Sequence, residues 1–230
     1  MLFSPPSNRL IDIILVSFLR NRMTLSLGAQ IVLALALFAE RSIADVPVPT
    51  TEGQVVTVAT VAADAEGVAY GIAVTDDGAD LYVSSYADHV VRHVDTATGV
   101  VSTIAGIEGT SGYADGVGTN ALFWATTGIQ CTGDGSTVYV TDKGNNRIRQ
   151  IDTATKMVTT LAFSGQKSHA DGVGTNAHIY KPGDMTMSTD ESTLYVAEYI
   201  GSRIRQIDIA SKTVTTLAGS GNNIVEDGIG

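Results

Sequence analysis

The sequence is poor in cysteine and in positive charge, and each shortage excludes a class of protein. A single cysteine among 230 residues leaves no internal disulfide framework and no cysteine-rich zinc site. Lysine and arginine number 14, against 24 aspartate and glutamate residues, and the net charge is −10. Because nucleic-acid binding needs a basic patch, this balance argues against a nucleic-acid partner. It also disfavours a basic ligand-binding face.

Sequence motifs of common enzymes are missing as well. The chain holds no His-Glu-x-x-His zinc motif, no Gly-x-Ser-x-Gly nucleophile motif, no phosphate-binding glycine-rich loop and no EF-hand loop. Two of its four histidines, His89 and His93, lie about 13 Å apart on an expected strand, too far to chelate one metal ion. We expect these two and His169 and His178 to be surface residues or to be satisfied by neighbouring groups.

The first 44 residues contain two apolar stretches, neither of which reaches the ~20 residues that span a bilayer. The second follows Arg20 and Arg22 and ends at Ser42-Ile43-Ala44, whose small residues suit a signal-peptidase site. We predict a signal peptide over residues 1–44, cleaved after Ala44. The mature chain, residues 45–230, would have no stable membrane span and would be secreted or luminal. The alternatives to a signal peptide are an uncleaved short anchor and an organelle-targeting leader, and translation could also start at Met23.

The chain after residue 45 repeats itself. Asp115-Gly-Val-Gly-Thr-Asn-Ala121 recurs 56 residues later as Asp171-Gly-Val-Gly-Thr-Asn-Ala177, and it begins again after another 56 residues as Asp227-Gly-Ile-Gly230. Two further sets of landmarks keep this period to within one residue: Tyr82, Tyr139 and Tyr195, and Asp95, Asp152 and Asp208. Independent landmarks with one period predict a repeat architecture.

Each unit predicts four short strands rich in Val, Ile, Thr and Tyr. In the middle unit we expect strands at 128–132, 137–141, 147–152 and 157–162, separated by Gly- and Asp-containing turns. Four antiparallel strands in a repeat of roughly 40–57 residues describe a β-propeller blade. The predicted fold is therefore all-β: a partial propeller of about three four-stranded blades, preceded by one strand at 54–60.

The third strand of each unit carries arginine on one face. Arg147 and Arg149 share a face in the middle unit, and Arg203 and Arg205 share it in the last. We expect the arginine stems to lie in grooves between blades while each guanidinium reaches an acid or water. This is a structural role rather than a binding one.

A signature segment of the middle unit runs Val138-Tyr-Val-Thr-Asp-Lys-Gly-Asn-Asn-Arg-Ile-Arg-Gln-Ile-Asp152. Leu-Ala and Asp-Gly-x-Gly-x-x-Ala segments follow it, and Pro182-Gly183 opens the next unit. Together these segments resemble the repeat of the NHL family, over roughly residues 54–230. The resemblance implies a β-propeller. It implies no single activity, because NHL propellers include protein-binding, RNA-binding and enzymatic members.

Propellers that the chain resembles usually close with about six blades, which at this period needs about 336 residues. An open fan of three blades leaves two apolar blade faces uncovered, and such faces favour self-association. We therefore expect either that the sequence is a fragment of a longer propeller or that two or more chains complete a ring.

The repeated linkers offer one possible metal site, at Asp115, Asp171 and Asp227. Calcium takes six to eight oxygen ligands, whereas each linker supplies one carboxylate plus Thr and Asn. We expect instead that the aspartate caps its turn while the glycines adopt positive φ. Calcium or zinc bound where the loops converge at the propeller mouth stays open.

A second candidate site is the loop Asp142-Lys-Gly-Asn-Asn146. Its counterparts at 85–89 and 198–202 differ in residue type, as ligand-facing loops do and as ordinary turns also do. Asp142, Asn145 and Asn146 are therefore candidate interaction-face residues, together with Asp115 and Asp171.

Two further side chains are expected to pack. Cys131 occupies a strand position held by Val74 in the first unit and is expected to be a small core residue. Trp124 is either packed at the hub or an exposed contact; because its counterpart is Tyr180, another large aromatic residue, we favour hydrophobic packing.

Two functions remain open. The first is a non-catalytic binding or scaffold module that presents loops on a rigid frame to a protein or glycan partner. The second is a metal-dependent hydrolase or lyase, by resemblance in architecture to gluconolactonase-like and peptide-amidating lyase propellers. Such a site needs carboxylate, Asn or His ligands from several blades. Because no polar constellation repeats, we favour the first and assign no catalytic or cofactor residue.

Overall fold

The computed structural model describes residues 69–221, within the second of two units of the chain, Val61–Gly230. The expected leader at 1–44, the leading strand at 54–60 and Asp227 lie outside the described residues. No helix within 69–221 has the length and apolar character needed to cross a membrane.

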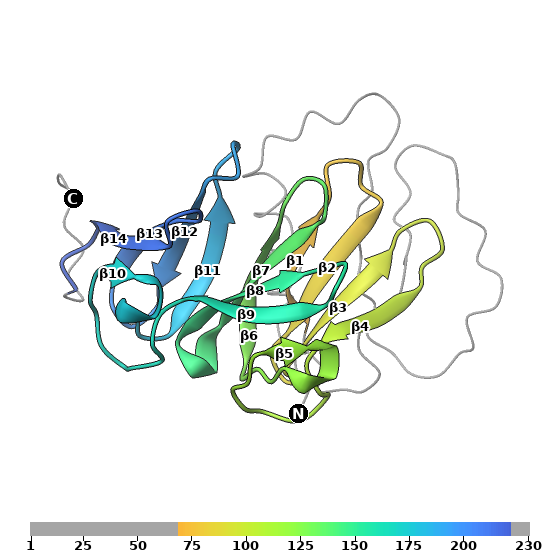
Figure 1. The fold of residues 1–230 in the computed structure, drawn as a ribbon, viewed down its shortest axis with the longest axis horizontal. Coiled ribbons are helices and arrows are strands. Elements are labelled where there is room, and N and C mark those ends of the chain that lie inside the picture. The colour runs from red at the N-terminus through yellow and green to blue at the C-terminus, as the bar shows by residue number, and fades with distance from the viewer. Residues whose placement is uncertain (1–68, 222–230) are drawn as a thin grey trace, which may run out of the picture. The chain divides into compact units, whose positions relative to one another are not determined.

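Three antiparallel sheets make up this part of the chain (Figure 1). The first sheet consists of β1 (Ala69–Val74), β2 (Asp80–Ser85), β3 (Val90–Asp95) and β4 (Val101–Ala105). The second consists of β5 (Gly116–Val117), β6 (Thr126–Cys131), β7 (Thr137–Asp142), β8 (Arg147–Asp152) and β9 (Met157–Ala162). The third consists of β10 (Gly172–Val173), β11 (Pro182–Met187), β12 (Thr193–Glu198), β13 (Arg203–Asp208) and β14 (Thr213–Ala218).

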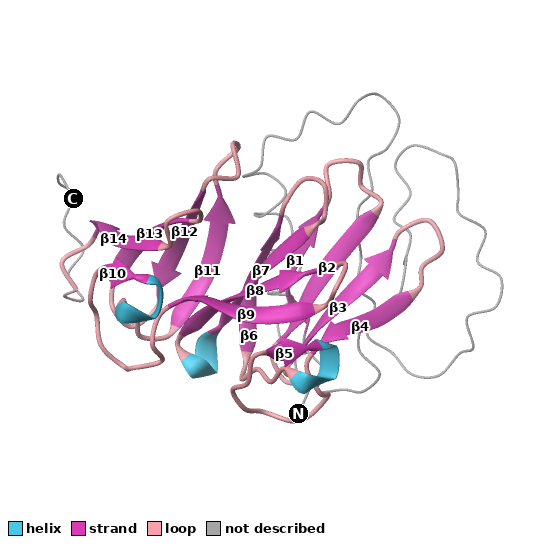
Figure 2. Cartoon of the chain, viewed as in Figure 1, coloured by secondary structure: helices cyan, strands magenta, loops and turns pink. Residues whose placement is uncertain are grey.

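Each sheet is a four-stranded meander, as predicted. The second and third sheets also carry a fifth strand that was not predicted: β5 pairs with β9, and β10 pairs with β14. These two-residue strands come from the linker that leaves the preceding sheet, so hydrogen bonds join consecutive sheets. A short 3-10 helix follows each of them, at Gly118–Asn120 and Gly174–Asn176, and a third 3-10 helix spans Lys143–Asn145 (Figure 2).

The predicted strand bounds are correct at β8 and β9, one residue short at the end of β7, and shifted at β6. β6 begins at Thr126 because this residue pairs with Asp142 across a register shift that precedes Ile129. A bulge of this kind inserts an extra residue into the strand and interrupts the alternation of inward and outward side chains. The start of the strand therefore cannot be recognised from the sequence pattern. The fold class, an all-β arrangement of propeller blades, is confirmed.

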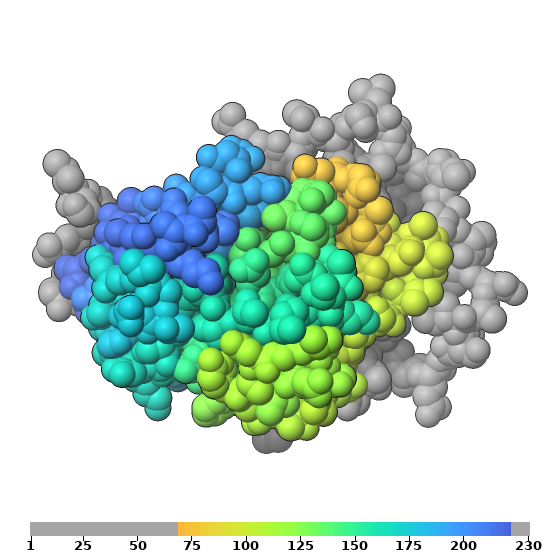
Figure 3. Space-filling view, viewed as in Figure 1, coloured from red at the N-terminus to blue at the C-terminus, as the bar shows by residue number. Residues whose placement is uncertain are grey.

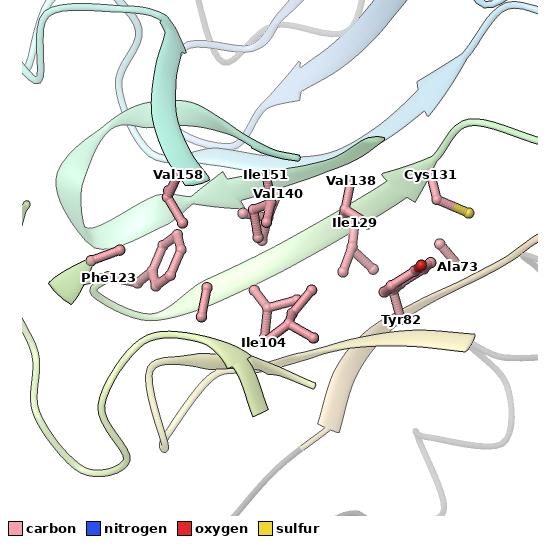
Figure 4. Packing of buried hydrophobic residues seen from close by; sticks show 13 residues of the cluster. Ala73, Tyr82, Ile104, Phe123, Ile129, Cys131, Val138, Val140, Ile151 and Val158 are labelled. Carbon is pink, nitrogen blue, oxygen red and sulfur yellow. The ribbon is translucent and has the colours of Figure 1, made fainter. Parts of the chain in front are cut away.

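Hydrophobic contacts cover both faces of the middle sheet. Val138 and Val140 belong to a cluster with residues of the first sheet, including Tyr82 and Ile104 (Figure 4). Tyr139, which lies between the two valines, belongs to a second cluster with residues of the third sheet. A strand covered on both faces needs apolar residues in succession, which explains the repeated apolar-Tyr-Val triplet.

The strands that open the three four-stranded meanders, β1, β6 and β11, lie in sequence, with β6 between the other two. β6 packs against β1 and β2 of the first sheet and against β11 of the third. The space-filling view shows the sheets in contact along the coloured chain (Figure 3). This is the arrangement of neighbouring blades around a propeller axis.

The third sheet leaves one of its faces uncovered. Leu161 and Ile148 of the middle sheet are 1% and 0% exposed, whereas their repeat equivalents Leu217 and Ile204 are 48% and 39% exposed. The three described sheets therefore do not close into a ring. Side chains that one blade buries against the next are open to solvent in the third.

Candidate functional site

A buried arginine joins each linker to the sheet that follows it. Arg149 is fully buried, and it donates from Nη2 to Asp115 at 2.6 Å and from Nη1 to Asp142 at 2.9 Å. It also donates to the carbonyl oxygens of Leu122 and Ala114. The expected structural role of this arginine is thus confirmed, and its partners are two acids and the linker backbone.

Arg205 repeats the arrangement one unit later. It is fully buried and donates to Asp171 at 2.9 Å and to the carbonyl oxygens of His178 and Ala170. Glu198 takes the place of Asp142, with an oxygen 3.6 Å from Nη1 of Arg205. The type of acid differs between the units, but the charge pairing is the same.

Asp115 and Asp171 therefore bind the next sheet instead of capping their own turns. Besides Arg149, Asp115 accepts hydrogen bonds from Thr160, and Asp171 accepts one from Thr216. The linker glycines do adopt positive φ where the chain reverses, as at Gly118, which has a φ of 56°. Within residues 69–221, no group of three or more His, Cys, Asp or Glu side chains is placed to hold a metal ion.

The loop at 142–146 is buried at both ends and half-buried between them. Asp142 is fully buried and accepts hydrogen bonds from Arg149, from the side chain of Asn145 and from the backbone N–H of Trp124. Burial raises the pKa of the Asp142 carboxyl, and these hydrogen bonds oppose that shift. Asn146 is also buried; its side-chain oxygen accepts from the backbone N–H of Lys181 at 2.8 Å.

Buried Asp142 and Asn146 thus hold the linkers in place, and neither is exposed. Asn145 is half-buried and donates to the carbonyl oxygen of Gly112 at 2.7 Å. A contact of these residues, or of Asp115 and Asp171, with a partner stays a prediction.

An open cleft lies beside this loop. Its volume is about 240 Å³. The residues that line it are Tyr86, Trp124, Ala125, Lys143, Gly144, Asn146, Lys167, Tyr180 and Lys181. We call it the Trp124 cleft. Tyr86 follows β2, Lys143 follows β7 and Lys181 immediately precedes β11, so all three repeat units contribute to the cleft.

Trp124 is 51% exposed, so of the two alternatives the structure shows an exposed side chain and not the favoured packing at the hub. Phe123, its fully buried neighbour, fills the core position instead. The indole lies against the backbone of Gly144: a Cβ atom there would stand 2.5 Å from Cγ of Trp124. The N–H of Gly144 also donates to the Trp124 carbonyl at 2.7 Å. The aromatic ring is therefore held in place while half of its surface faces solvent.

The cleft gathers positive charge in an acidic chain. Three of the five lysines of the sequence, Lys143, Lys167 and Lys181, line it. None of the three forms an ion pair among the residues that the structure describes. Desolvation and the nearby charge of Lys181 lower the pKa of Lys143. The ammonium of Lys143 also lies 4.7 Å from the ring centroid of Tyr199. The local charge is thus opposite in sign to the net charge.

Each of the four histidines has a hydrogen-bond partner, and the cysteine is buried. His93 pairs with Asp80 and His169 with Glu198, each at 2.5 Å. His89 stands in a turn rather than on a strand, and its Nδ1 accepts from the N–H of Ala125; Nδ1 of His178 contacts the Ser168 hydroxyl. The expectation of satisfied histidines is confirmed. Cys131 is buried, as expected, and burial raises the pKa of its thiol to about 12.

Comparisons with known proteins agree with this architecture. No family model matches the chain. It is 32% identical over 146 residues to Protein SUPPRESSOR OF QUENCHING 1, chloroplastic, of Arabidopsis thaliana, covering 60% of this chain and 14% of that protein. It is 31% identical over 142 residues to NHL repeat-containing protein 2 of Bos taurus, covering 59% of this chain and 20% of that protein. The chain thus spans a fifth or less of these relatives.

A solved structure of a protein of unknown function from Bacteroides thetaiotaomicron shares the fold. Its TM-score is 0.55 at 21% identity, and the match covers 71% of this chain and 38% of that one. The described sheets therefore define a class of protein, the β-propeller with four-stranded blades. The resemblance of the blades to the NHL-repeat family is confirmed by the relatives that carry this name.

Proposed function

We propose that this chain is a non-catalytic binding module of a secreted or luminal compartment, and that it holds a protein or glycan partner at the Trp124 cleft. The main support is the cleft itself, in which three repeat units place an exposed indole and three lysines around one opening, and these lysines form no ion pair within residues 69–221. Exposed aromatic side chains with nearby charged groups are typical of recognition sites.

The frame around the cleft is suited to binding because it is held by buried contacts. Asp142 fixes the backbone N–H of Trp124, and Asn146 fixes that of Lys181. Arg149 in turn holds Asp142. Side chains presented on such a frame lose little conformational freedom when a partner binds, which favours affinity.

A panel experiment tests the binding function. Immobilised wild-type chain and the Trp124→Ala variant are exposed to a defined set of extracellular glycans and purified matrix proteins. We expect a partner that wild type binds and Trp124→Ala does not, while Val117→Thr, a change at an exposed linker residue that does not line the cleft, binds as wild type does. Equal binding of a partner by all three chains would exclude the Trp124 cleft as the binding site. Calcium or zinc retained by the purified chain would instead favour a metal-dependent hydrolase or lyase.

The proposed compartment rests on residues 1–44 and has its own test. The full sequence is expressed in a secretory host, and the exported chain is analysed by N-terminal sequencing. We expect Asp45 as the first residue, because Ser42 and Ala44 supply the small side chains before the cleavage site. A chain that stays inside the cell with residues 1–44 attached would contradict secretion.

A further inference from the structure

We propose that the Trp124 cleft binds a carboxylated sugar ring, such as a terminal hexuronic-acid residue of a glycan. The inference rests on the proposed binding function and names the ligand class of the same cleft. It follows from the size of the cleft, from the charge of its lining and from the way Trp124 is held.

The size and the charge of the cleft select a small anion. Its volume of about 240 Å³ is below the roughly 300–1,000 Å³ of sites for drug-sized ligands, so a single ring is the natural occupant. Among the described residues that line the cleft, the charged side chains are Lys143, Lys167 and Lys181. The carboxylates directly behind the lining, Asp142 and Glu198, are fully buried and face Arg149 and Arg205, so negatively charged ligand oxygens would meet the lysines first.

The indole of Trp124 supplies a surface for the body of the ligand. The face of an aromatic ring carries partial negative charge, so it attracts the C–H groups of a saturated ring rather than a carboxylate. A sugar acid presents both groups, with C–H bonds on a ring face and a carboxylate at its edge. Its ring can lie on Trp124 while its carboxylate reaches the lysines, and the hydroxyl groups of Tyr86 and Tyr180 can bond to the sugar hydroxyls.

The charges also explain why binding would be favourable. The ammonium groups of Lys143 and Lys181 repel each other, and this repulsion contributes to the lowered pKa of Lys143. A bound carboxylate would offset that repulsion.

An acidic peptide fits the cleft less well. A peptide binds chiefly through main-chain hydrogen bonds, and the side-chain amide of Asn146 is already bonded to Gly165 and Lys181. A run of acidic residues would also be repelled by a chain of net charge −10, whereas a ligand with one carboxylate meets much less repulsion.

The test uses the fluorescence of Trp124, which is the only tryptophan of the sequence and so reports on the cleft alone. The chain is titrated with D-glucuronate, with D-glucose and with acetate at constant ionic strength. We expect a saturable change with glucuronate at a concentration about tenfold or more below that needed for the other two. No change with glucuronate, or an equal response to acetate, would overturn the proposal.

Two lysine variants test whether the lysines of the cleft are responsible for glucuronate binding. Lys181→Gln is expected to weaken glucuronate binding about tenfold by removing one charge-assisted contact. The matched control is Lys156→Gln, which changes an exposed lysine that does not line the cleft and should bind as wild type does. Circular dichroism and thermal unfolding establish that both variants are folded. Equal weakening in both variants would overturn the assignment.

The same titration with a short glutamate-containing peptide separates this inference from the proposed function. Peptide binding without glucuronate binding would overturn the sugar ligand and leave the binding module standing. Only the panel experiment can contradict the proposed binding function, because that function requires the Trp124→Ala variant to lose a partner that wild type binds.

Discussion

Arg149 and Asp142 face each other with both side chains removed from water, and Asp115 completes the site at its exposed edge. A buried ion pair contributes little net stability when it is compared with apolar residues, but loss of one partner leaves an uncompensated charge. Arg149 also satisfies two backbone carbonyl groups of the linker. Arg149 therefore connects the linker between the first and second sheets to the second sheet.

We expect Asp142→Ala to lower the free energy of unfolding by about 3–5 kcal/mol, because Arg149 would then be buried without its fully buried partner. Asp115→Asn changes the partner that remains partly exposed, and it should cost about 1 kcal/mol or less. Urea denaturation of both variants measures the difference. Equal costs would show that burial does not govern the strength of these two pairs.

Cys131 gives a second expectation for a single residue. With its pKa raised from 9.0 to about 12, the native thiol should react with a thiol reagent about a thousandfold more slowly than the unfolded chain. Following the release of the chromophore from an aromatic disulfide reagent, with and without denaturant, measures this ratio. Equal rates would show that the first and second sheets separate readily around Cys131.

The turn between the third and fourth strands recurs as an element of each sheet. Asp95, Asp152 and Asp208 each accept a hydrogen bond from the backbone N–H three residues later. These backbone hydrogen bonds are the main cause of the lowered pKa of all three carboxyls. Each bond thus favours the ionised form in the folded chain.

The sign of the resulting pH dependence follows from this direction. A carboxyl whose pKa is lower in the folded chain stabilises it above the unfolded pKa, and that stability is lost as the pH falls below about 4. We expect the melting temperature to drop in this range. The drop should be smaller in the Asp152→Asn, Asp208→Asn double variant, since asparagine keeps an acceptor without titrating. An unchanged pH profile in that variant would contradict a role for these turns.

At the scale of the whole molecule, the uncovered face of the third sheet is the main feature. Leu217 and Ile204 present apolar surface that the middle sheet buries at Leu161 and Ile148. Apolar surface of this kind favours association because its burial removes it from water. This agrees with the sequence-based expectation of self-association through open blades, which stays a prediction.

Light scattering on purified residues 45–230 tests that expectation. We expect a concentration-dependent rise in mass above that of the monomer, and an Ile204→Thr, Leu217→Thr double variant should need about tenfold more protein for the same rise. Val117→Thr, which changes an exposed apolar residue of a linker, should associate as wild type does. A monomer at all concentrations would show that this face is not an interface between copies.

Much of the fold was accessible from the sequence because the information is local and repeated. The period of 56 residues, the apolar-Tyr-Val triplets and the turn residues each depend on neighbours within one unit. Strands β8 and β9 were predicted with correct bounds for this reason. The position of Arg149 in a groove followed from the alternation of side chains along a strand.

The linker strands and the cleft required the tertiary structure. β5 has only two residues, too few for a periodic pattern, and it forms because β9 of the next sheet offers hydrogen-bonding partners. Asp115 was expected to cap its own turn, but its partner Arg149 comes from that same later sheet. The sequence carries no signal that Tyr86 and Lys181 meet at one cleft, because this meeting depends on how the sheets pack.

The sequence by itself determined the repeat, the all-β class and the four strands of each unit, because strand pairing within a unit is local. The tertiary structure alone decided that Phe123 is buried while Trp124 is exposed, and that three lysines of an acidic chain surround the same indole. The physical reason is that net charge and composition are sums over the chain, whereas a binding site depends on which side chains the packing of separate units brings together.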